Sequence, residues 1–217
     1  MSEPAGKSPN VPARADVISA DDIARRLGEA ARAGGERRNR SGGAPVHLWN
    51  PDYCGELDIR IARDGLWHYL GTPIGRPQLV RLFASVLRRD ADDRYYLVTP
   101  VEKIGITVDD VPFVAVDFHV EGEGSGQSLV FLTNVGDEAA AGPENPIRLE
   151  RNEKTGEPTP YVLIRGRLEA RIDRKSFYRL VDIGEVKGEH FGVCSGGEFY
   201  PLATVAELDG AELDGAS

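Results

Sequence analysis

The chain lacks the marks of a membrane, secreted or disulfide-bonded protein. No apolar run approaches the ~20 residues that a membrane-spanning helix requires. No apolar stretch follows a basic start, as it does in a secretory signal. The two cysteines, Cys54 and Cys194, form no CxxC pair. These absences exclude a transmembrane helix and favour a reduced, cytoplasmic protein.

A surplus of basic residues is missing as well. The formal net charge is −9, whereas a protein that binds DNA or RNA needs cations to displace the counterions of the phosphate backbone. We therefore expect no nucleic acid polymer as a partner.

The charge is nevertheless uneven along the chain. Residues 165–179 contain six basic and two acidic side chains, a local charge of +4 (six minus two). The basic ones are Arg165, Arg167, Arg171, Arg174, Lys175 and Arg179, and the acidic ones are Glu169 and Asp173. A basic island of this size suits one small anion better than a polymer.

Composition shifts divide the chain into four parts. The first 44 residues begin with a run rich in Pro, Ser and Gly and then show a helical pattern that Ser19 can cap. The last stretch, "ATVAELDGAELDGAS", has four acids and no base. We expect residues 1–44 to form a flexible extension with one helix, 45–91 a small α+β unit, 92–203 a β-rich domain and 204–217 a disordered acidic tail.

Each of the two central parts contains a hairpin that leads into a helix. In the first, Asp64-Gly65 forms a two-residue turn between alternating strands, and Pro77 suits the first turn of the helix that follows. In the second, "YVLIR" and "LEARI" form the hairpin, and Asp173 can cap the next helix.

A ten-residue phrase occurs at both of these junctions. "IGRPQLVRLF" begins at Ile74, and "IDRKSFYRLV" begins at Ile172 with four of ten positions identical. Chance similarity between amphipathic helices is one explanation. Duplication is the other, and we favour it because amphipathicity does not require the shared arginines, Arg76 and Arg174. The predicted fold is α+β, with mostly antiparallel sheets in two units related by duplication.

Three runs, "GTPIGR", "LVTPVEK" and "DDVPF", resemble the bacterial family called domain of unknown function 1285. The resemblance covers roughly residues 45–202. It implies a duplicated core and a C-terminal domain like a pleckstrin-homology fold, a partly open barrel. The family has no established activity; a nucleotide-like ligand at the domain interface and a role in signalling have been suggested. The resemblance supplies no catalytic residue and no cofactor.

The residues most suited to an anion are arginines near the starts of the two helices. Unpaired N–H groups at a helix start already favour an anion, and an arginine fork can grip phosphate or carboxylate through two hydrogen bonds. The predicted anion-binding residues are Arg76, Arg165, Arg171, Arg174, Thr99 and Lys103, with Trp67 and Tyr178 as stacking surfaces for a base. Internal ion pairs to Glu102, Asp109 or Asp110 are the favoured alternative explanation of the arginines, and aromatic residues near hairpins commonly belong to the core.

One strand presents three possible metal ligands. Asp117, His119 and Glu121 alternate onto one face of "DFHVEG", and such residues can bind a divalent metal. A solvated outer face explains the same pattern. The opposite face, expected to be core, contains Val114, Val116, Phe118 and Val120.

Taken together, the residues predict a non-enzymatic ligand-binding or regulatory module. Its ligand would be a small anion, a nucleotide among the candidates, held between the two units without a cofactor. Two alternatives stay open: a protein-interaction domain with no small ligand, and a metal-dependent hydrolase that uses the Asp117, His119 and Glu121 face.

Overall fold

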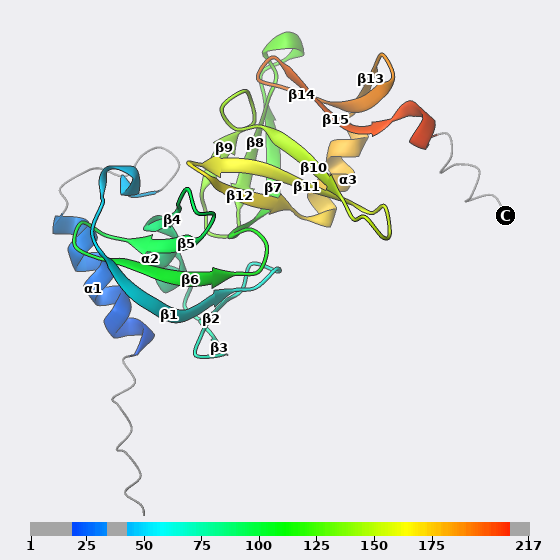
Figure 1. Ribbon diagram of the computed structural model, residues 1–217. Coiled ribbons are helices and arrows are strands. Elements are labelled where there is room, and N and C mark those ends of the chain that lie inside the picture. Colours follow the sequence, from blue (N-terminus) through cyan, green and yellow to red (C-terminus); the bar gives the residue numbers. More distant parts are fainter. Residues whose placement is uncertain (1–18, 34–42, 209–217) are drawn as a thin grey trace, which may run out of the picture.

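The computed structural model describes residues 19–33 and 43–208 (Figure 1). Within these residues the chain forms two six-stranded sheets, a three-stranded sheet and short helices that cover them. The predictions made for residues 1–18, 34–42 and 209–217, namely the flexible start and most of the acidic tail, lie outside the described residues.

The first sheet contains the first six strands, in the order β3-β2-β1-β6-β5-β4. The strands are β1 (Tyr53–Ile61), β2 (Trp67–Tyr69), β3 (Thr72–Pro73), β4 (Leu87–Arg89), β5 (Tyr95–Val98) and β6 (Lys103–Val108). A 3-10 turn, η1 (Val46–Leu48), precedes them. Strand β1 pairs antiparallel with β2 but parallel with β6, so the sheet is mixed.

Two helices pack together at the first sheet, α1 (Ala20–Ala33) and α2 (Pro77–Ser85). Helix α1 begins where the sequence predicted it, with Ser19 Oγ accepting a hydrogen bond from the N–H of Asp22. Its thin apolar stripe, Ile23 and Leu27, is buried. None of the helices in the described residues is long and apolar enough to cross a membrane.

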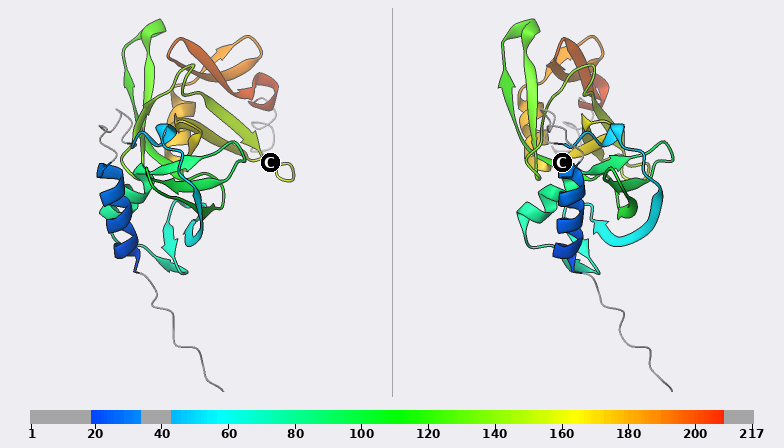
Figure 2. Two further views of the ribbon diagram at one scale, coloured as in Figure 1. Left: turned by 60° about the vertical axis from the view of Figure 1, so that its left-hand side comes forward. Right: turned by 90° about the vertical axis from the view of Figure 1, so that its left-hand side faces the viewer.

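The second sheet has the order β10-β11-β12-β7-β8-β9. The strands are β7 (Phe113–Glu121), β8 (Ser128–Thr133), β9 (Glu138–Ala140), β10 (Ile147–Arg151), β11 (Pro158–Arg165) and β12 (Leu168–Ile172), with η2 (Gly124–Gly126) at the β7–β8 tip. Edge strand β9 contacts β11, so the sheet curls into a half-barrel. Figure 2 shows the β7–β8 hairpin extending past the rest of the sheet.

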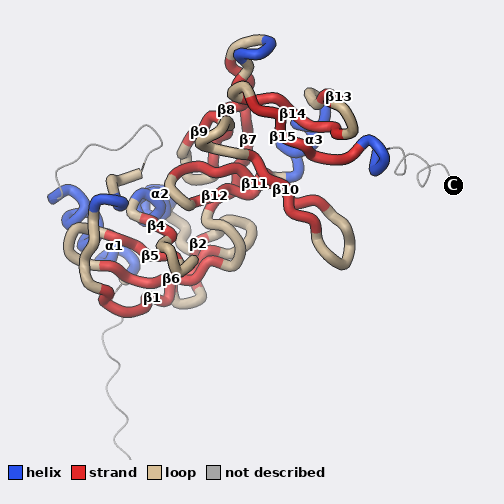
Figure 3. Tube along the Cα trace, turned by 45° about the horizontal axis from the view of Figure 1, so that its top comes forward, coloured by secondary structure: helices blue, strands red, loops and turns tan. Residues whose placement is uncertain are grey.

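Helix α3 (Arg174–Asp182) lies between the second and third sheets, where it contacts β7 and β14. Asp173 caps it as predicted, its carboxylate accepting a 2.7 Å hydrogen bond from the N–H of Ser176. The third sheet has the order β13-β14-β15 and lies beyond the second sheet from the first (Figure 3). Its strands are β13 (Glu185–Lys187), β14 (His190–Ser195) and β15 (Glu198–Thr204).

The two halves repeat one arrangement. In each, an antiparallel hairpin precedes a nine-residue helix, and one hairpin strand pairs in parallel with a strand distant in sequence: β1 with β6, and β12 with β7. All other pairings between the named strands are antiparallel. The predicted α+β fold of mostly antiparallel sheets in two similar halves is thereby confirmed.

The halves share one core, and a buried arginine of the second half bonds to the first. The Arg165 side chain is only 8% exposed; it donates from Nε to Asp137 over 3.1 Å and from Nη2 to the carbonyl oxygen of Ala84 over 2.6 Å. Ala84 belongs to α2, so this bond fastens the second sheet to the helix of the first half. Arg165 therefore serves the join between the halves.

The strand pairing places the division between the halves later than the sequence suggested. We expected the first unit to end at residue 91, but β5 and β6 complete the first sheet, which runs to Val108. At the other end, residues 205–208, expected to begin the disordered tail, are helical. Hydrogen bonds from Thr204 N–H and Oγ1 to the Glu207 carboxylate help to begin this turn.

Candidate functional site

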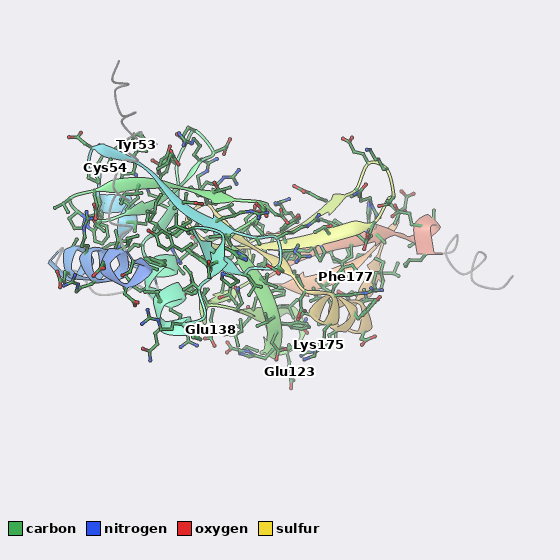
Figure 4. The ribbon with its side chains drawn as sticks, turned by 90° about the horizontal axis from the view of Figure 1, so that it is seen from below. Tyr53, Cys54, Glu123, Glu138, Lys175 and Phe177 are labelled. Carbon is green, nitrogen blue, oxygen red and sulfur yellow. The ribbon has the colours of Figure 1, made fainter. Side chains whose placement is uncertain are left out.

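A hollow of about 510 Å³ opens where the β1–β2 turn meets β12 and the start of α3. We call it the arginine hollow, because three guanidinium groups line it, those of Arg63, Arg171 and Arg174. The remaining lining residues are Glu157, Pro158, Thr159, Pro160, Ile172, Phe177 and Tyr178. Figure 4 shows Phe177 on α3.

Local structure places each of the three arginines. Arg63 precedes the tight Asp64-Gly65 turn, where Gly65 has φ +83° and an added Cβ would lie 2.7 Å from Asn134 Nδ2. Arg171 lies in β12, paired with Val114 of β7. Arg174 is the first residue of α3, directly after the capping Asp173.

Two of the three guanidinium groups have bonding capacity to spare. Arg174 donates from Nε to the hydroxyl of Tyr178 over 2.9 Å, and no ion pair is present for it among the described residues. Arg171 donates from Nη2 to the carbonyl oxygen of Arg63 over 3.0 Å, while its buried Nε has no hydrogen-bond partner in the described chain. This Nε is closed off from solvent, so the atoms of Arg171 and Arg174 that can meet a ligand are their outer guanidinium nitrogens.

The charge of the hollow is positive. Arg63 has a loose ion partner, Asp110, at 3.6 Å, and Glu157 is the acidic side chain of the lining. The pKa of Arg174 is raised, first by its hydrogen bond to Tyr178, so its guanidinium stays charged. Three cations against one lining carboxylate make a local charge of +2, which attracts small anions.

Arg76 lies at a different place, and the expectation that the two repeated arginines share one cleft is corrected. Arg76 forms an ion pair with Asp21 of α1 and lines a separate hollow with Gln78 and Arg81 at the start of α2. The duplication repeats the arginine at the start of each helix, but the two helices cover different sheets, so their starts do not converge.

Three other residues of the predicted site make contacts away from the hollow. Thr99 is fully buried and accepts from the N–H of Glu102 over 3.2 Å within a turn. Lys103 donates to Asp90 over 3.2 Å. Trp67 is 2% exposed and stacks on Phe83 at 6.2 Å, as a core residue does. Of the predicted set, the structure brings Arg171, Arg174 and Tyr178 together.

Sequence reasoning missed Arg63, Phe177 and the "EPTP" segment of residues 157–160. Arg63 had one usable signal, its place beside a strong turn, but the neighbour of that turn is β12, more than a hundred residues later. The start of β11 carries no motif and joins the hollow only because β11 pairs with β12.

The proposed metal face does not assemble. Asp117 forms an ion pair with Arg179, and His119 Nε2 lies 3.1 Å from the carboxylate of Glu121. The hydrogen bond from Arg179 is the first cause of the lowered pKa of Asp117. In residues 19–33 and 43–208, no three His, Cys, Asp or Glu side chains are grouped to hold a metal ion.

A bulge explains a related correction in β7. The sequence placed Val116 and Val120 on the core face with Phe118, but the register shifts between Ala115 and Asp117. The alternation therefore slips by one residue at that point: Ala115 and Phe118 are buried, whereas Val116 is exposed. Val120 keeps the face of Phe118 but is exposed, because it lies in the part of the hairpin that extends past the rest of the sheet (Figure 2).

Comparison with known proteins gives a family and no activity. The family described as "Domain of unknown function (DUF1285), N-terminal domain" matches residues 44–111, and "Protein of unknown function (DUF1285), C-terminal domain" matches residues 112–202. No curated protein matched the chain.

Two solved structures are similar to this chain. A DUF1285 family protein from Silicibacter pomeroyi DSS-3 is 59% identical, with a TM-score of 0.75, and the match covers 84% of this chain and 97% of that one. A DUF1285 family protein from Shewanella baltica OS155 is 28% identical, with a TM-score of 0.46, over 57% of this chain and 90% of that one.

Proposed function

Since the chain belongs to the DUF1285 family, whose N-terminal and C-terminal domains it contains in that order, we propose that it is a non-enzymatic module that binds a small anion in the arginine hollow. The observation that carries this proposal is the pair of guanidinium groups, those of Arg171 and Arg174, that line one hollow and have no carboxylate partner in the described chain. Such groups bind phosphate or carboxylate through paired hydrogen bonds.

The ligand would touch both halves of the protein. Arg63 belongs to the N-terminal family domain, and Arg171 and Arg174 belong to the C-terminal one. An anion held by all three would strengthen the contact between the domains. A regulatory or signalling role is proposed on this ground, because the bound anion would change how firmly the halves are joined.

A nucleotide is a candidate because Tyr178 borders the hollow with 53% of its surface exposed. An exposed ring beside cations can stack on a base while the arginines hold the phosphates. Pyrophosphate carries the phosphate chemistry without the base, so a comparison of the two ligands separates the stacking contribution from the charge contribution.

The proposal is tested by calorimetric titration of pyrophosphate and of ATP into wild type, Arg174→Ala and Arg171→Ala. Each substitution removes a charged donor, and we expect the affinity to fall about tenfold or more. Arg76→Ala is the matched control, since Arg76 lies at the start of the other helix and lines a different hollow. Equal heats for wild type and Arg174→Ala would remove Arg174 from the site.

A protein-interaction domain is the second candidate. All three residues of edge strand β13 are exposed, including Val186 at 58%, and an exposed edge can accept an additional strand. Wild type that binds neither pyrophosphate nor ATP would favour this function.

A further inference from the structure

We propose that residues 209–217, the acidic end of this chain, bind the arginine hollow of the same molecule and compete there with the external anion. The competition rests on the proposed function, whereas contact between the tail and the hollow can be tested alone. The family match ends at residue 202, so this feature lies outside it.

The tail and the hollow are complementary in charge. Residues 209–217, "DGAELDGAS", contain three acids, Asp209, Glu212 and Asp214, and no base. The hollow has three guanidinium groups against one lining carboxylate. The two charges are opposite, and the tail meets the same donors that an external phosphate would meet.

The described part of the chain ends near the rim of the hollow. Glu207, two residues before Asp209, accepts a 3.0 Å hydrogen bond from Arg151 at the end of β10. Arg151 is paired with Pro158 of β11, and Pro158 lines the hollow. Directly paired residues of antiparallel strands have Cα atoms about 4.5–5.5 Å apart. One ion pair and one strand spacing therefore separate Glu207 from the rim.

The nine residues of the tail are enough to reach the hollow. Nine extended residues span up to about 30 Å, which exceeds one strand spacing plus the length of the Arg151–Glu207 ion pair. Because the tail is attached to the same molecule, its effective concentration at the hollow is on the order of millimolar. A weak ionic contact is then sufficient to occupy the site for part of the time.

The lining also suits the one large apolar residue of the tail. Leu213 lies between Glu212 and Asp214. Pro158, Pro160 and Phe177 offer apolar surface beside the arginines. An "ELD" segment can therefore place carboxylates on the guanidinium groups and its leucine on this apolar side.

The test of contact compares amide spectra of the isotope-labelled full chain. The first variant combines Asp209→Asn, Glu212→Gln and Asp214→Asn. The control combines Glu123→Gln, Glu138→Gln and Glu144→Gln, which removes the same charge from exposed positions that contribute nothing to the hollow. We expect the amide signals of Thr159, Arg171 and Arg174 to shift in the first variant and not in the control. Equal spectra at these amides in both variants would overturn the inference.

The test of competition is titration of pyrophosphate into the same two variants and wild type. We expect the tail variant to bind about threefold more tightly or better, because the occupied fraction of the hollow is released. Wild type and tail variant with equal, measurable affinity would overturn the competition and leave the proposed function standing. Shifted amides with no pyrophosphate binding in any variant would support the tail contact and remove the proposed function.

Discussion

Arg171 and Arg63 are joined by a hydrogen bond from the Nη2 atom of Arg171 to the main-chain carbonyl oxygen of Arg63, over 3.0 Å. The bond links β12 of the second sheet to the β1–β2 turn of the first. It uses one edge of the guanidinium, and the buried Nε remains without a partner in the described chain. A single side chain thus fixes one wall of the hollow and also lines the space that a ligand would fill.

The substitution Arg171→Lys separates the hydrogen bonds of the guanidinium from its charge. Lysine keeps the positive charge but has no planar fork. It therefore cannot donate to the Arg63 carbonyl oxygen and present a second donor to a ligand in the same geometry. We expect the affinity for pyrophosphate to fall about tenfold in calorimetry. Arg76→Lys is the control, and we expect it to bind as wild type does. Full affinity in Arg171→Lys would mean that the hollow acts through charge only.

The buried ion pair between Arg165 and Asp137, both in the second half, should be important for the stability of the fold. The two side chains are 8% and 10% exposed, and removal of one partner leaves the other charge buried. We expect Arg165→Met to lower the free energy of unfolding by about 3–5 kcal/mol, measured by urea denaturation.

Two further variants check the cause. Adding Asp137→Asn to Arg165→Met should restore part of the loss, because no unpaired charge then remains. Arg60→Met breaks the more exposed pair with Asp109 and should cost little. Equal losses in Arg165→Met and Arg60→Met would contradict the importance of burial.

The sequence could predict this fold mainly where a few adjacent residues decide the structure. The Asp64-Gly65 turn, Pro77 in the first turn of α2 and the cap at Asp173 all occur as expected. Turn and cap preferences act within about four residues and need no distant partner. The duplicated hairpin and helix follow from these signals.

The parallel pairings and the site depend on contacts between distant segments. No local sequence signal indicates that β6 pairs with β1, so the predicted division between the halves lies too early in the chain. The same limit applies to Arg63, which reaches the hollow only through Arg171. Arg174 and Arg171 could be predicted because the basic island is continuous in sequence, whereas Arg76 depends on which sheet its helix covers.

Tyr161 gives the fold a pH-dependent contact next to the hollow. Burial, then the nearby Asp110 carboxylate, raise the pKa of this phenol to about 12, compared with 10.0 ordinarily. A raised pKa means that the folded state holds the proton more tightly. The stabilisation is therefore complete below pH 10.0 and is lost as pH rises through about 12.

The measurement is the difference in phenolate absorbance between wild type and Tyr161→Phe as the pH rises. We expect the titration step that Tyr161→Phe lacks to have a pKa near 12 in wild type. Asp110→Asn should move this pKa toward the ordinary value, because the hydrogen-bonded carboxylate is removed. If the step that Tyr161→Phe lacks had a pKa near 10.0 in wild type, Tyr161 would titrate as an exposed tyrosine does.

The Asp117, His119 and Glu121 face should not retain a divalent metal. Arg179 occupies the carboxylate of Asp117, and a metal ion would have to displace that cation. We expect wild type and Asp117→Asn to contain the same amount of metal after incubation with zinc or manganese and desalting. Stoichiometric metal in wild type that is lost in Asp117→Asn would revive the hydrolase hypothesis.

The most direct test of the anion site is a crystal structure of the protein soaked with tungstate, a heavy analogue of small oxyanions. We expect an anomalous peak in the arginine hollow, within hydrogen-bond distance of the guanidinium groups of Arg171 and Arg174. Peaks confined to other surfaces, with both arginines unchanged, would contradict it.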